Sequence, residues 1–300
     1  MNRWLLVGLL LLTPSLAHAR TLCVNPTGSA GCFATVQQAV DAAAPRDTIH
    51  VAGGTYPEAV VIDKRLRIIG TFDTLIDGGC TANAAVTIAA DGVRFEKIGV
   101  NGGTLANIDV ENVDGVSLIA IGSLATCPGV AYGIKAVNAT RLIVKNSGFF
   151  NFPDGCGSPL HNNIVFGAAA IYISRTPANG RVTVSHNLDC NSATGILVED
   201  TVASSTTVPP SVMLLRNTMS FSERGIFLSR SDGVAVRSNR VVGPVPRGTV
   251  GIEVGVGSDD NVIMQNYIDG YAADVSDAGT SNCWRSNHFT TGSVPSTGCP

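Results

Sequence analysis

The chain has 300 residues, of which 45% are hydrophobic and only 14% are charged, with 33 glycines and a formal net charge of −3. An average soluble domain carries about 25% charged residues, so a disordered chain and a coiled coil, both of which are rich in charge, are excluded. A dedicated nucleic-acid binder would normally be basic, and no nucleic-acid partner is expected. The composition favours a protein made mainly of buried β-strands joined by turns.

The first residues form a segment typical of an export signal. Arg3 gives it a positive start, residues 4–12 are apolar apart from one glycine, and Ala17-His18-Ala19 places small residues where signal peptidases cleave. The apolar stretch is too short for a membrane-spanning helix, which needs about 20 residues. We therefore expect a signal peptide over 1–19, no membrane span, and a secreted or periplasmic mature chain over 20–300 that forms one domain.

All eight cysteines lie in the part that would be exported. An even number of cysteines in an oxidising compartment predicts disulfides. Short loops close with the least loss of entropy, so we expect Cys23–Cys32 and Cys283–Cys299 to staple the two ends and Cys156–Cys190 to tie down a long loop, although eight cysteines allow about 105 connectivities. Zinc binding is the alternative, but no CxxC or clustered Cys/His spacing supports it. No metal site is expected.

One segment near the start has the spacing of an amphipathic helix. Apolar residues recur at helical intervals between residues 33 and 43. Thr35 followed by Gln38 matches a capping box, and a proline ends the pattern. We expect one short helix, Thr35–Ala44, inside a capping segment over 33–45.

From Thr48 onward the chain consists of short apolar runs separated by Gly, Asn and Asp. The first of these runs are Ile49–Val51, Val60–Ile62, Leu66–Ile69, Val86–Ile88 and Val93–Phe95. Short runs bounded by turn residues predict β-strands.

Beyond residue 130 the runs fall into a repeat. Each unit begins with Gly or Ala followed by Ile, at Gly133-Ile134, Ala170-Ile171, Gly195-Ile196, Gly225-Ile226 and Gly251-Ile252. Each unit also carries a later asparagine, at Asn146, Asn187, Asn217, Asn239, Asn266 and Asn287. A short minimum spacing with longer intervals indicates a fixed unit with loop insertions, as in a solenoid. A β-sandwich or propeller with chance periodicity is the alternative.

A recurring turn asparagine has a structural explanation in a solenoid. Asparagine tolerates left-handed backbone angles. An amide stacked on the amide of the next coil can donate on one side and accept on the other. Each coil would supply strands that pair only with the coils before and after it, which makes the sheets parallel.

Four early segments resemble known proteins. They are Phe33-Ala-Thr-Val-Gln-Gln-Ala-Val-Asp-Ala-Ala, Asp47-Thr-Ile-His-Val, Gly54-Thr-Tyr-Pro-Glu58 and Leu66-Arg-Ile-Ile-Gly70. On these segments the chain resembles the pectin-lyase-like superfamily, and its opening is similar to those of pectin methylesterases and NosD-type repeat proteins. The resemblance implies an all-β fold, a right-handed parallel β-helix of roughly ten coils with a short helix capping its N-terminal end. It also implies that the Gly-Ile strands form the first sheet, which would carry the substrate cleft, and that the asparagines lie between the second and third sheets.

The catalytic motifs of characterised relatives are absent or incomplete. Of the pectin methylesterase and polygalacturonase motifs, only Asp259-Asp260 is clearly present, and a turn explains it without catalysis. The segment from Arg175 to Arg181 is one residue longer than the Arg-x-Pro-x-x-Arg element of pectate lyases. The clustered carboxylates that would bind calcium are not evident. No cofactor is expected, and calcium is the alternative left open.

The repeat register nevertheless assembles a patch. Aligning the Gly/Ala-Ile strands with Ile inside places the next residue outside, and this outward column reads Lys135, Tyr172, Leu197, Phe227 and Glu253. Glu199 faces out two residues further along, and the strand ends carry Arg175, Asp200 and Arg230. Neighbouring parallel strands lie about 4.8 Å apart, so these side chains would touch from coil to coil.

Two expected loop insertions, near 147–169 and 201–211, border this patch. The first carries Asp154 and His161. Long loops on a rigid scaffold often form binding sites.

We interpret the patch as a site for an acidic polysaccharide. Aromatic rings can stack on sugars, and the expected substrate-binding residues are Tyr172, Leu197, Phe227, Asp154 and His161. Acid–base groups could support hydrolysis or elimination while arginines fork onto sugar carboxylates, and the expected catalytic residues are Glu199, Asp200, Arg175 and Arg230.

A charge ladder that helps adjacent coils pair would explain the same residues. The protein would then be a non-catalytic exported β-helix serving as a structural, adhesive or accessory binding module. The sequence leaves open whether the protein is an enzyme, which polysaccharide it meets and how many copies assemble.

Overall fold

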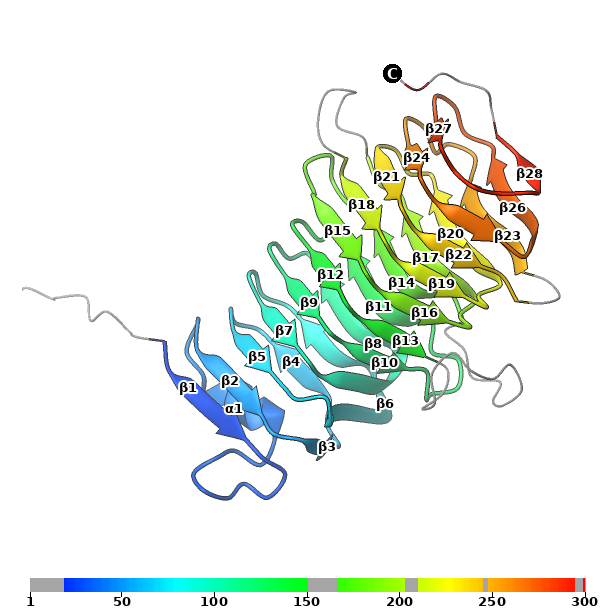
Figure 1. Ribbon diagram of the computed structural model, residues 1–300. Coiled ribbons are helices and arrows are strands. Elements are labelled where there is room, and N and C mark those ends of the chain that lie inside the picture. The colour runs from blue at the N-terminus through cyan, green and yellow to red at the C-terminus, as the bar shows by residue number, and fades with distance from the viewer. Residues whose placement is uncertain (1–18, 151–166, 203–209, 245–247, 295–298, 300) are drawn as a thin grey trace, which may run out of the picture.

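The computed structural model describes residues 19–150, 167–202, 210–244, 248–294 and 299. Short strands follow one another around a solenoid axis, and each strand pairs in parallel with the equivalent strands of the neighbouring coils (Figure 1). The predicted parallel β-solenoid is therefore confirmed, and a β-sandwich or propeller is excluded.

Each full coil contributes three strands to three parallel sheets, which we call sheets 1, 2 and 3. In one coil these are β11 (Tyr132–Val137), β12 (Ile143–Lys145) and β13 (Gly148–Phe150). Strand β6 (Thr74–Ile88) and strand β8 (Gly99–Glu111) each run through sheet 3 and on into sheet 1 of the next coil.

The remaining strands repeat this pattern along the axis. Sheet 1 contains β4 (Val60–Ile62), β11, β14 (Ala169–Ser174), β17 (Thr194–Glu199), β20 (Arg224–Ser229), β23 (Gly248–Val254), β26 (Tyr271–Asp277) and β28 (Gly292–Ser293). Sheet 2 contains β1 (Thr21–Val24), β2 (Thr48–Val51), β5 (Arg67–Ile69), β7 (Arg94–Glu96), β9 (Ser117–Ile119), β12, β15 (Val182–Ser185), β18 (Val212–Leu215), β21 (Val234–Arg237), β24 (Val262–Met264) and β27 (Cys283–Arg285). Sheet 3 contains β3 (Gly54–Tyr56), β10 (Gly122–Leu124), β13, β16 (Leu188–Cys190), β19 (Thr218–Ser220), β22 (Arg240–Val242) and β25 (Tyr267–Asp269).

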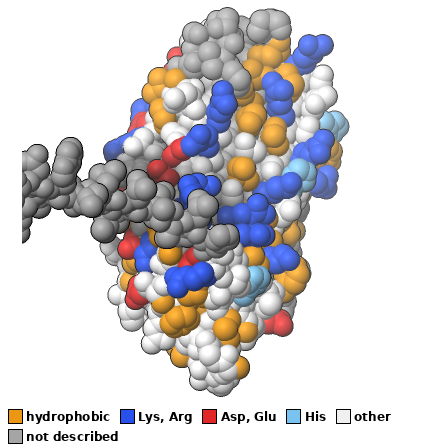
Figure 2. Space-filling model, turned by 90° about the vertical axis from the view of Figure 1, so that its left-hand side faces the viewer, with side chains coloured by type: hydrophobic (Ala, Val, Ile, Leu, Met, Phe, Trp, Pro, Cys, Tyr) orange, Lys and Arg blue, Asp and Glu red, His pale blue; other side chains and the backbone are white. Residues whose placement is uncertain are grey.

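Alternate residues of most strands fill the solenoid interior. The isoleucines of the Gly/Ala-Ile pairs are paired coil to coil and are at most 1% exposed. The outward residues are more polar, and in Figure 2 Lys, Arg and His side chains gather in a band on the side of the molecule where the sheet 2 strands lie in Figure 1. The low overall charge thus follows from a chain in which half of each strand is interior.

A ladder of stacked asparagines runs along the turn between sheets 2 and 3, as expected. The Nδ2 atom of Asn187 donates to Oδ1 of Asn217 at 3.0 Å, and Asn217 donates in the same way to Asn239 at 3.0 Å. Asn266 and Asn287 continue the ladder. The amide of Asn217, for example, donates both to the next asparagine and to the carbonyl of Val184 in the preceding coil, and accepts from Asn187 of that preceding coil.

The first predicted rung of this ladder was wrong by one position. The N–H of Ser147, not Asn146, donates to the Oδ1 atom of Asn187 at 2.9 Å. Asn146 instead takes the exposed left-handed turn position, with φ of 54°. Asparagine suits both positions, so composition alone did not separate them.

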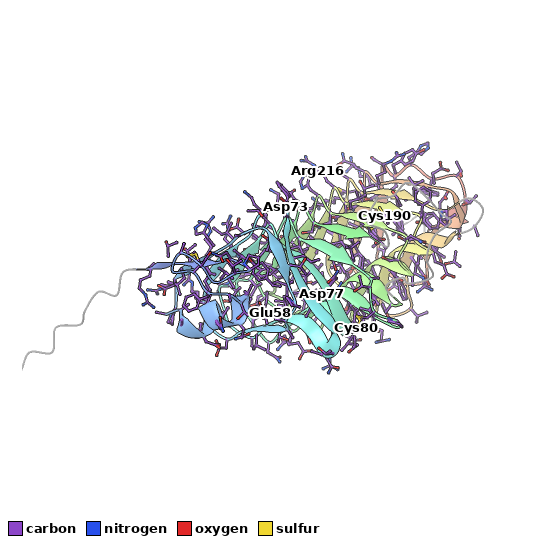
Figure 3. The ribbon with its side chains drawn as sticks, turned by 90° about the horizontal axis from the view of Figure 1, so that it is seen from below. Glu58, Asp73, Asp77, Cys80, Cys190 and Arg216 are labelled. Carbon is purple, nitrogen blue, oxygen red and sulfur yellow. A yellow bond between two sulfur atoms is a disulfide. The ribbon has the colours of Figure 1, made fainter. Side chains whose placement is uncertain are left out.

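The short helix α1 (Val36–Ala42) closes the N-terminal end of the solenoid and is shorter than predicted. Thr35 caps it by accepting from the N–H of Gln38 at 3.2 Å. The Glu58 carboxylate, labelled in Figure 3, accepts from the N–H groups of Val36 and Gln37 at 2.7 and 2.9 Å. A carboxylate at a helix N-terminus satisfies unpaired donors and complements the helix dipole, so a residue distant in sequence anchors the cap.

Three disulfides join described cysteines. Cys23–Cys32 and Cys283–Cys299 are confirmed, and Cys80–Cys127 adds a link between coils. Cys190 is also disulfide-bonded, but Cys156 lies outside the described residues. The predicted Cys156–Cys190 pair thus stays a prediction.

Several expectations fall partly or wholly outside the described ranges. Residues 1–18 of the expected signal peptide do so, as do Asp154 and His161 and much of both expected insertions. Among the described residues, no helix is long and apolar enough to cross a membrane.

Candidate functional site

The outward column predicted from the repeat lies on sheet 1. Register pairs Lys135 with Tyr172, Tyr172 with Leu197, Leu197 with Phe227, and Phe227 with Glu253. We call this column and its charged neighbours the sheet 1 face. Its aromatic side chains are half-buried rather than fully exposed, because adjacent long side chains cover one another.

Two acidic residues that the sequence reasoning missed extend this face. Asp109 and Glu111 of β8 pair in register with Lys135 and Val137. The repeat signature starts at Gly133, so the preceding coil was not aligned. The signal that could have found them is the alternation Ile108-Asp109-Val110-Glu111, which places both carboxylates outside.

Lys135 bridges these two carboxylates. Its Nζ atom lies 3.1 Å from Oδ1 of Asp109 and also contacts Oε1 of Glu111. Burial raises the pKa of Asp109 above its ordinary value, although the ammonium group opposes the shift. The three charges therefore form a closed cluster that ties two coils together.

Tyr172 lies at the centre of the face. Its ring stacks on the ring of Tyr132, with centroids 4.8 Å apart and an interplanar angle of 20°. Its hydroxyl donates to Oε2 of Glu199 at 2.8 Å. Burial, together with the nearby Glu199 carboxylate, raises the pKa of Tyr172 to about 12, so the phenol keeps its proton and remains a donor.

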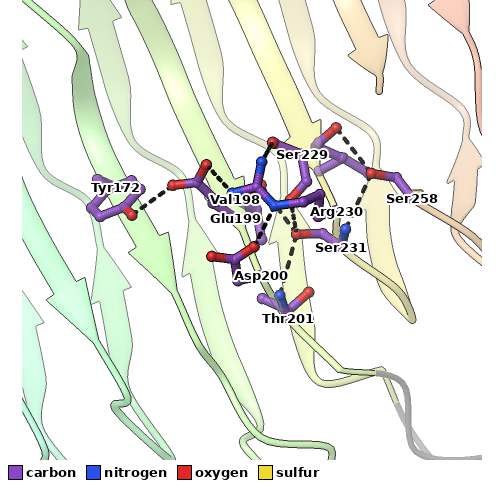
Figure 4. Close-up of polar contacts among 10 residues, drawn as sticks. Tyr172, Val198, Glu199, Asp200, Thr201, Ser229, Arg230, Ser231 and Ser258 are labelled. Atoms are coloured by element: carbon purple, nitrogen blue, oxygen red, sulfur yellow. Dashed lines mark hydrogen bonds and ion pairs between the residues drawn. The ribbon is translucent and has the colours of Figure 1, made fainter. Parts of the chain in front are cut away.

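Arg230 joins the two predicted catalytic carboxylates (Figure 4). Its Nη2 atom lies 2.7 Å from Oε1 of Glu199, and its Nε atom lies 2.7 Å from Oδ1 of Asp200. The Arg230 side chain is 60% exposed. Both oxygens of Glu199 are thus occupied, one by Arg230 and the other by Tyr172.

The predicted Arg175–Asp200–Arg230 row is only partly joined. Asp200 contacts Arg230, but no ion pair links either of them to Arg175. Arg175 is exposed at the end of β14, with a left-handed φ of 53°. Its backbone N–H donates to the carbonyl of Glu199 at 3.1 Å. Its guanidinium takes no part in the ion-pair network of Arg230, Glu199 and Asp200.

Phe227 is covered by a residue that the sequence reasoning did not single out. The guanidinium carbon of Arg224 lies 4.4 Å from the Phe227 ring centroid. Arg224 also forms an ion pair with Glu253, at 2.9 Å between Nε and Oε2. At this end of the face, the Arg224 guanidinium forms a cation–π contact with the Phe227 ring. One side of that ring is therefore covered by protein and is closed to a ligand.

The expected Asp259-Asp260 turn is also present. Asp260 has a left-handed φ of 55°, and Oδ1 of Asp259 accepts from the backbone N–H of Thr280 at 2.6 Å. These carboxylates shape a turn and are not part of the sheet 1 face.

The fold belongs to the class of pectate-lyase-like right-handed parallel β-helices. Pectate lyase Pel9A matches with a TM-score of 0.52 and 13% identity, covering 92% of this chain and 80% of that one. PfbA, a surface adhesin of Streptococcus pneumoniae, matches with a TM-score of 0.51 and 14% identity, covering 86% and 76%. XylC in complex with xylose matches with a TM-score of 0.51 and 9% identity, covering 87% and 69%. These likenesses concern the fold alone.

A family model assigns the chain more narrowly. The family described as periplasmic copper-binding protein (NosD) matches residues 101–296, so the chain belongs to the NosD family. A comparison with curated proteins found no match.

The described residues do not fit a copper site. Copper is held by soft or imidazole ligands such as Cys, Met and His. No group of three or more His, Cys, Asp or Glu in the described part of the chain could hold a metal ion, and the described cysteines are disulfide-bonded. No chemical step is therefore derived through copper.

Proposed function

We propose that this protein is an exported β-helix that binds an acidic polysaccharide on its sheet 1 face without cleaving it. The observation that carries the proposal is the position of Arg175. Its exposed guanidinium has no ion-pair partner among the described residues, and Arg175 directly follows β14, the strand that carries Tyr172. A free guanidinium can fork onto a sugar carboxylate while the neighbouring stacked tyrosines supply flat apolar surface.

The occupancy of the carboxylates argues for binding rather than cleavage. Hydrolysis or elimination needs an acid or a base that can reach the reacting atom. On this face Glu199 already holds Tyr172 and Arg230, and Asp109 and Glu111 hold Lys135. These groups brace the scaffold, which leaves Arg175 as the open charge.

The compartment and the fold support a carbohydrate ligand outside the cytoplasm. Several disulfides are typical of oxidising compartments, and the family is described as periplasmic. Proteins with this fold include a pectate lyase, a surface adhesin and a protein bound to xylose. Because one fold hosts many functions, these neighbours support the ligand class only by analogy.

The test is affinity electrophoresis of the protein through gels containing polygalacturonate, alginate or a neutral glucan, with and without calcium. We expect retardation by an acidic polymer and none by the neutral one. Arg175→Gln should weaken binding about fivefold, as expected for the loss of one exposed ion pair worth about 1 kcal/mol.

Arg181→Gln is the matched control, because Arg181 is also exposed and left-handed, with φ of 50°, at the far end of the next turn. It should bind like the native protein. Equal affinity of the Arg175 variant and the native protein would overturn the site, and release of reducing or unsaturated ends would show cleavage instead.

A further inference from the structure

A second charged surface lies at the corner between sheets 2 and 3, away from sheet 1. The register defines three outward columns there: the last residues of the sheet 2 strands, the left-handed turn residues that follow, and the first residues of the sheet 3 strands. We call the cations on these columns the basic strip. They are Lys97, Lys145, Arg216, Arg237, Arg240 and Arg285.

The basic strip contains no compensating acid. Downstream of Glu96, the three columns hold no Asp or Glu down to Arg285. On other parts of the surface, acids do neutralise some of the arginines: Arg67 and Arg94, for example, share the buried Glu96. In a chain with a net charge of −3, the strip is therefore a local excess of positive charge.

Every cation of the strip is exposed, and none forms an ion pair with a described residue. Arg216 projects from the outer edge of the solenoid in Figure 3. The strip lies on the side of the molecule where Figure 2 shows the band of Lys, Arg and His, with few acidic side chains. Solvated cations without partners are available to an outside anion.

The C-terminal part of the strip also presents flat surface. The Arg240 guanidinium carbon lies 4.8 Å from the ring centroid of Tyr267, and that ring stacks on His288 at 4.9 Å with an interplanar angle of 9°. These three residues occupy successive coils of the third column. A cation beside stacked rings can contact both the charge and the body of a sugar unit.

The spacing of the cations fits a linear partner. Strands β7 and β27, which frame Lys97 and Arg285, are seven strand intervals apart in sheet 2, or roughly 34 Å at about 4.8 Å per interval. The positive charges are spread along this length instead of converging on one point. A single phosphate or metal ion would need converging groups, whereas a linear polyanion can meet the charges one after another.

The residues around the strip and the disulfides of the protein argue against two other anionic partners, a lipid bilayer and a nucleic acid. A bilayer-docking surface needs exposed apolar anchors, but the apolar residues on the strip, such as Leu215 and Met264, are only half-exposed. Of the large exposed hydrophobic side chains among the described residues, Phe72 lies at this corner, in the turn between β5 and β6 one coil before Lys97, and a single ring makes no apolar face; the others, such as Val256, lie away from it. Several disulfides indicate an oxidising compartment outside the nucleus and cytosol, which disfavours nucleic acid.

We infer that the basic strip binds a linear anionic glycan, at a second surface separate from the sheet 1 face. Guanidinium groups pair bidentately with carboxylate or sulfate oxygens, and the repeat of the solenoid places them in line along the polymer. The strip shares a ligand class with the proposed function, but it uses different residues and does not require that function to be correct.

The experiment measures binding of polygalacturonate and of dextran sulfate to the full chain at several salt concentrations. The test variant is Arg216→Gln with Arg237→Gln. The control is Arg46→Gln with Arg65→Gln, which removes the same charge from exposed positions outside the strip. We expect the test variant to lose about tenfold in affinity, which is about 1.4 kcal/mol for the two lost ion pairs together, and the control less than twofold.

Each outcome decides the inference. Equal losses in both double variants would show unspecific attraction and overturn it, as would binding to anionic phospholipid vesicles but to neither glycan. Circular dichroism of both variants checks that they remain folded. If the strip variant loses binding and Arg175→Gln does not, this inference stands and the proposed function is overturned. If Arg175→Gln loses binding and the strip variant does not, the proposed function stands and this inference is overturned.

Discussion

The sheet 1 face and the basic strip are both charged, yet they treat charge in opposite ways. On the sheet 1 face nearly every acid meets a cation of a neighbouring coil, as Glu199 meets Arg230 and Asp109 meets Lys135. On the basic strip the cations meet solvent. Paired charges stabilise the stacking of coils, whereas unpaired charges contribute little to folding and are free for a partner. A charged side chain that is paired with a neighbouring residue is therefore a weaker sign of ligand binding than one without a counterion.

The four residues predicted to be catalytic divide in the same way. The expected catalytic residues Glu199, Asp200 and Arg230 do come together, but they satisfy one another. Arg175, the fourth expected catalytic residue, stays outside the network and becomes the best candidate for ligand contact. The charge-ladder alternative thus describes most of the face.

The largest expected effect concerns a charge that is neither paired nor exposed. Asp189 is 1% exposed and accepts from the hydroxyls of Ser192 and Ser222 and from the backbone N–H of Cys190, none of which carries a charge. Burial raises its pKa to about 7, above the unfolded value of about 3.9. Its contribution to stability is therefore fully present below about pH 4 and is lost as the pH rises through about 7.

We expect Asp189→Asn to remove this loss. Relative to the variant, the native protein should lose up to about 4 kcal/mol of unfolding free energy between pH 4 and 8. Urea unfolding of both proteins at pH 4 and pH 8 measures the difference. Parallel pH profiles would mean that the buried carboxyl is not the titrating group.

The next effect separates structure from binding at the corner that carries the strip, by comparing a buried residue of the asparagine ladder with its exposed neighbour. Asn217 is fully buried, donates to Asn239 and Val184, and accepts from Asn187. Asn217→Ala should lower the unfolding free energy by about 3 kcal/mol because several buried groups lose their partners.

The adjacent Arg216→Gln is its matched control. Arg216 is exposed and unpaired among the described residues, so its replacement should change the unfolding free energy by less than about 0.5 kcal/mol while weakening polyanion binding. Chemical denaturation of both variants checks this. A large loss of stability in the Arg216 variant would contradict the view that the strip is spare charge.

The smallest effect tests the paired region. Tyr172→Phe removes the hydrogen bond to Glu199 and keeps the ring that stacks on Tyr132. It should lower the unfolding free energy by about 1 kcal/mol. Tyr267→Phe, which removes only an exposed contact of 3.4 Å to Asp269, should have almost no effect. Thermal unfolding of the two variants side by side measures the contrast, and equal shifts would show that the Tyr172 contact is not bracing the face.

The repeat made much of the sheet 1 face predictable. Side chains along a strand alternate between its two faces. Once Ile171 or Ile196 is assigned to the solenoid interior, every other residue of its strand is therefore assigned to the interior or to the surface. The whole column from Lys135 to Glu253 was obtained in this way. The preceding coil, which carries Asp109, lacks the Gly-Ile signature and was missed.

The basic strip was beyond the reach of the same reasoning. Its cations occupy three different columns, and the distances between them along the chain vary with the length of each loop. The contact between Glu58 and the N-terminus of α1, which joins residues more than 20 positions apart, was hidden for the same reason.

The sequence by itself determined the class of fold, the interior isoleucines and the stacking of turn asparagines, because these depend on local periodicity and on a unit that repeats. Only the tertiary structure decided which charges meet. Glu199 meets Arg230, whereas Arg216 meets no acid among the described residues, and both results depend on how many residues each loop inserts between one coil and the next. The chain has few charged residues, and the fold distributes them unevenly. Along the sheet 1 face most charged side chains form ion pairs, whereas along the basic strip the cations are unpaired in the described part of the chain.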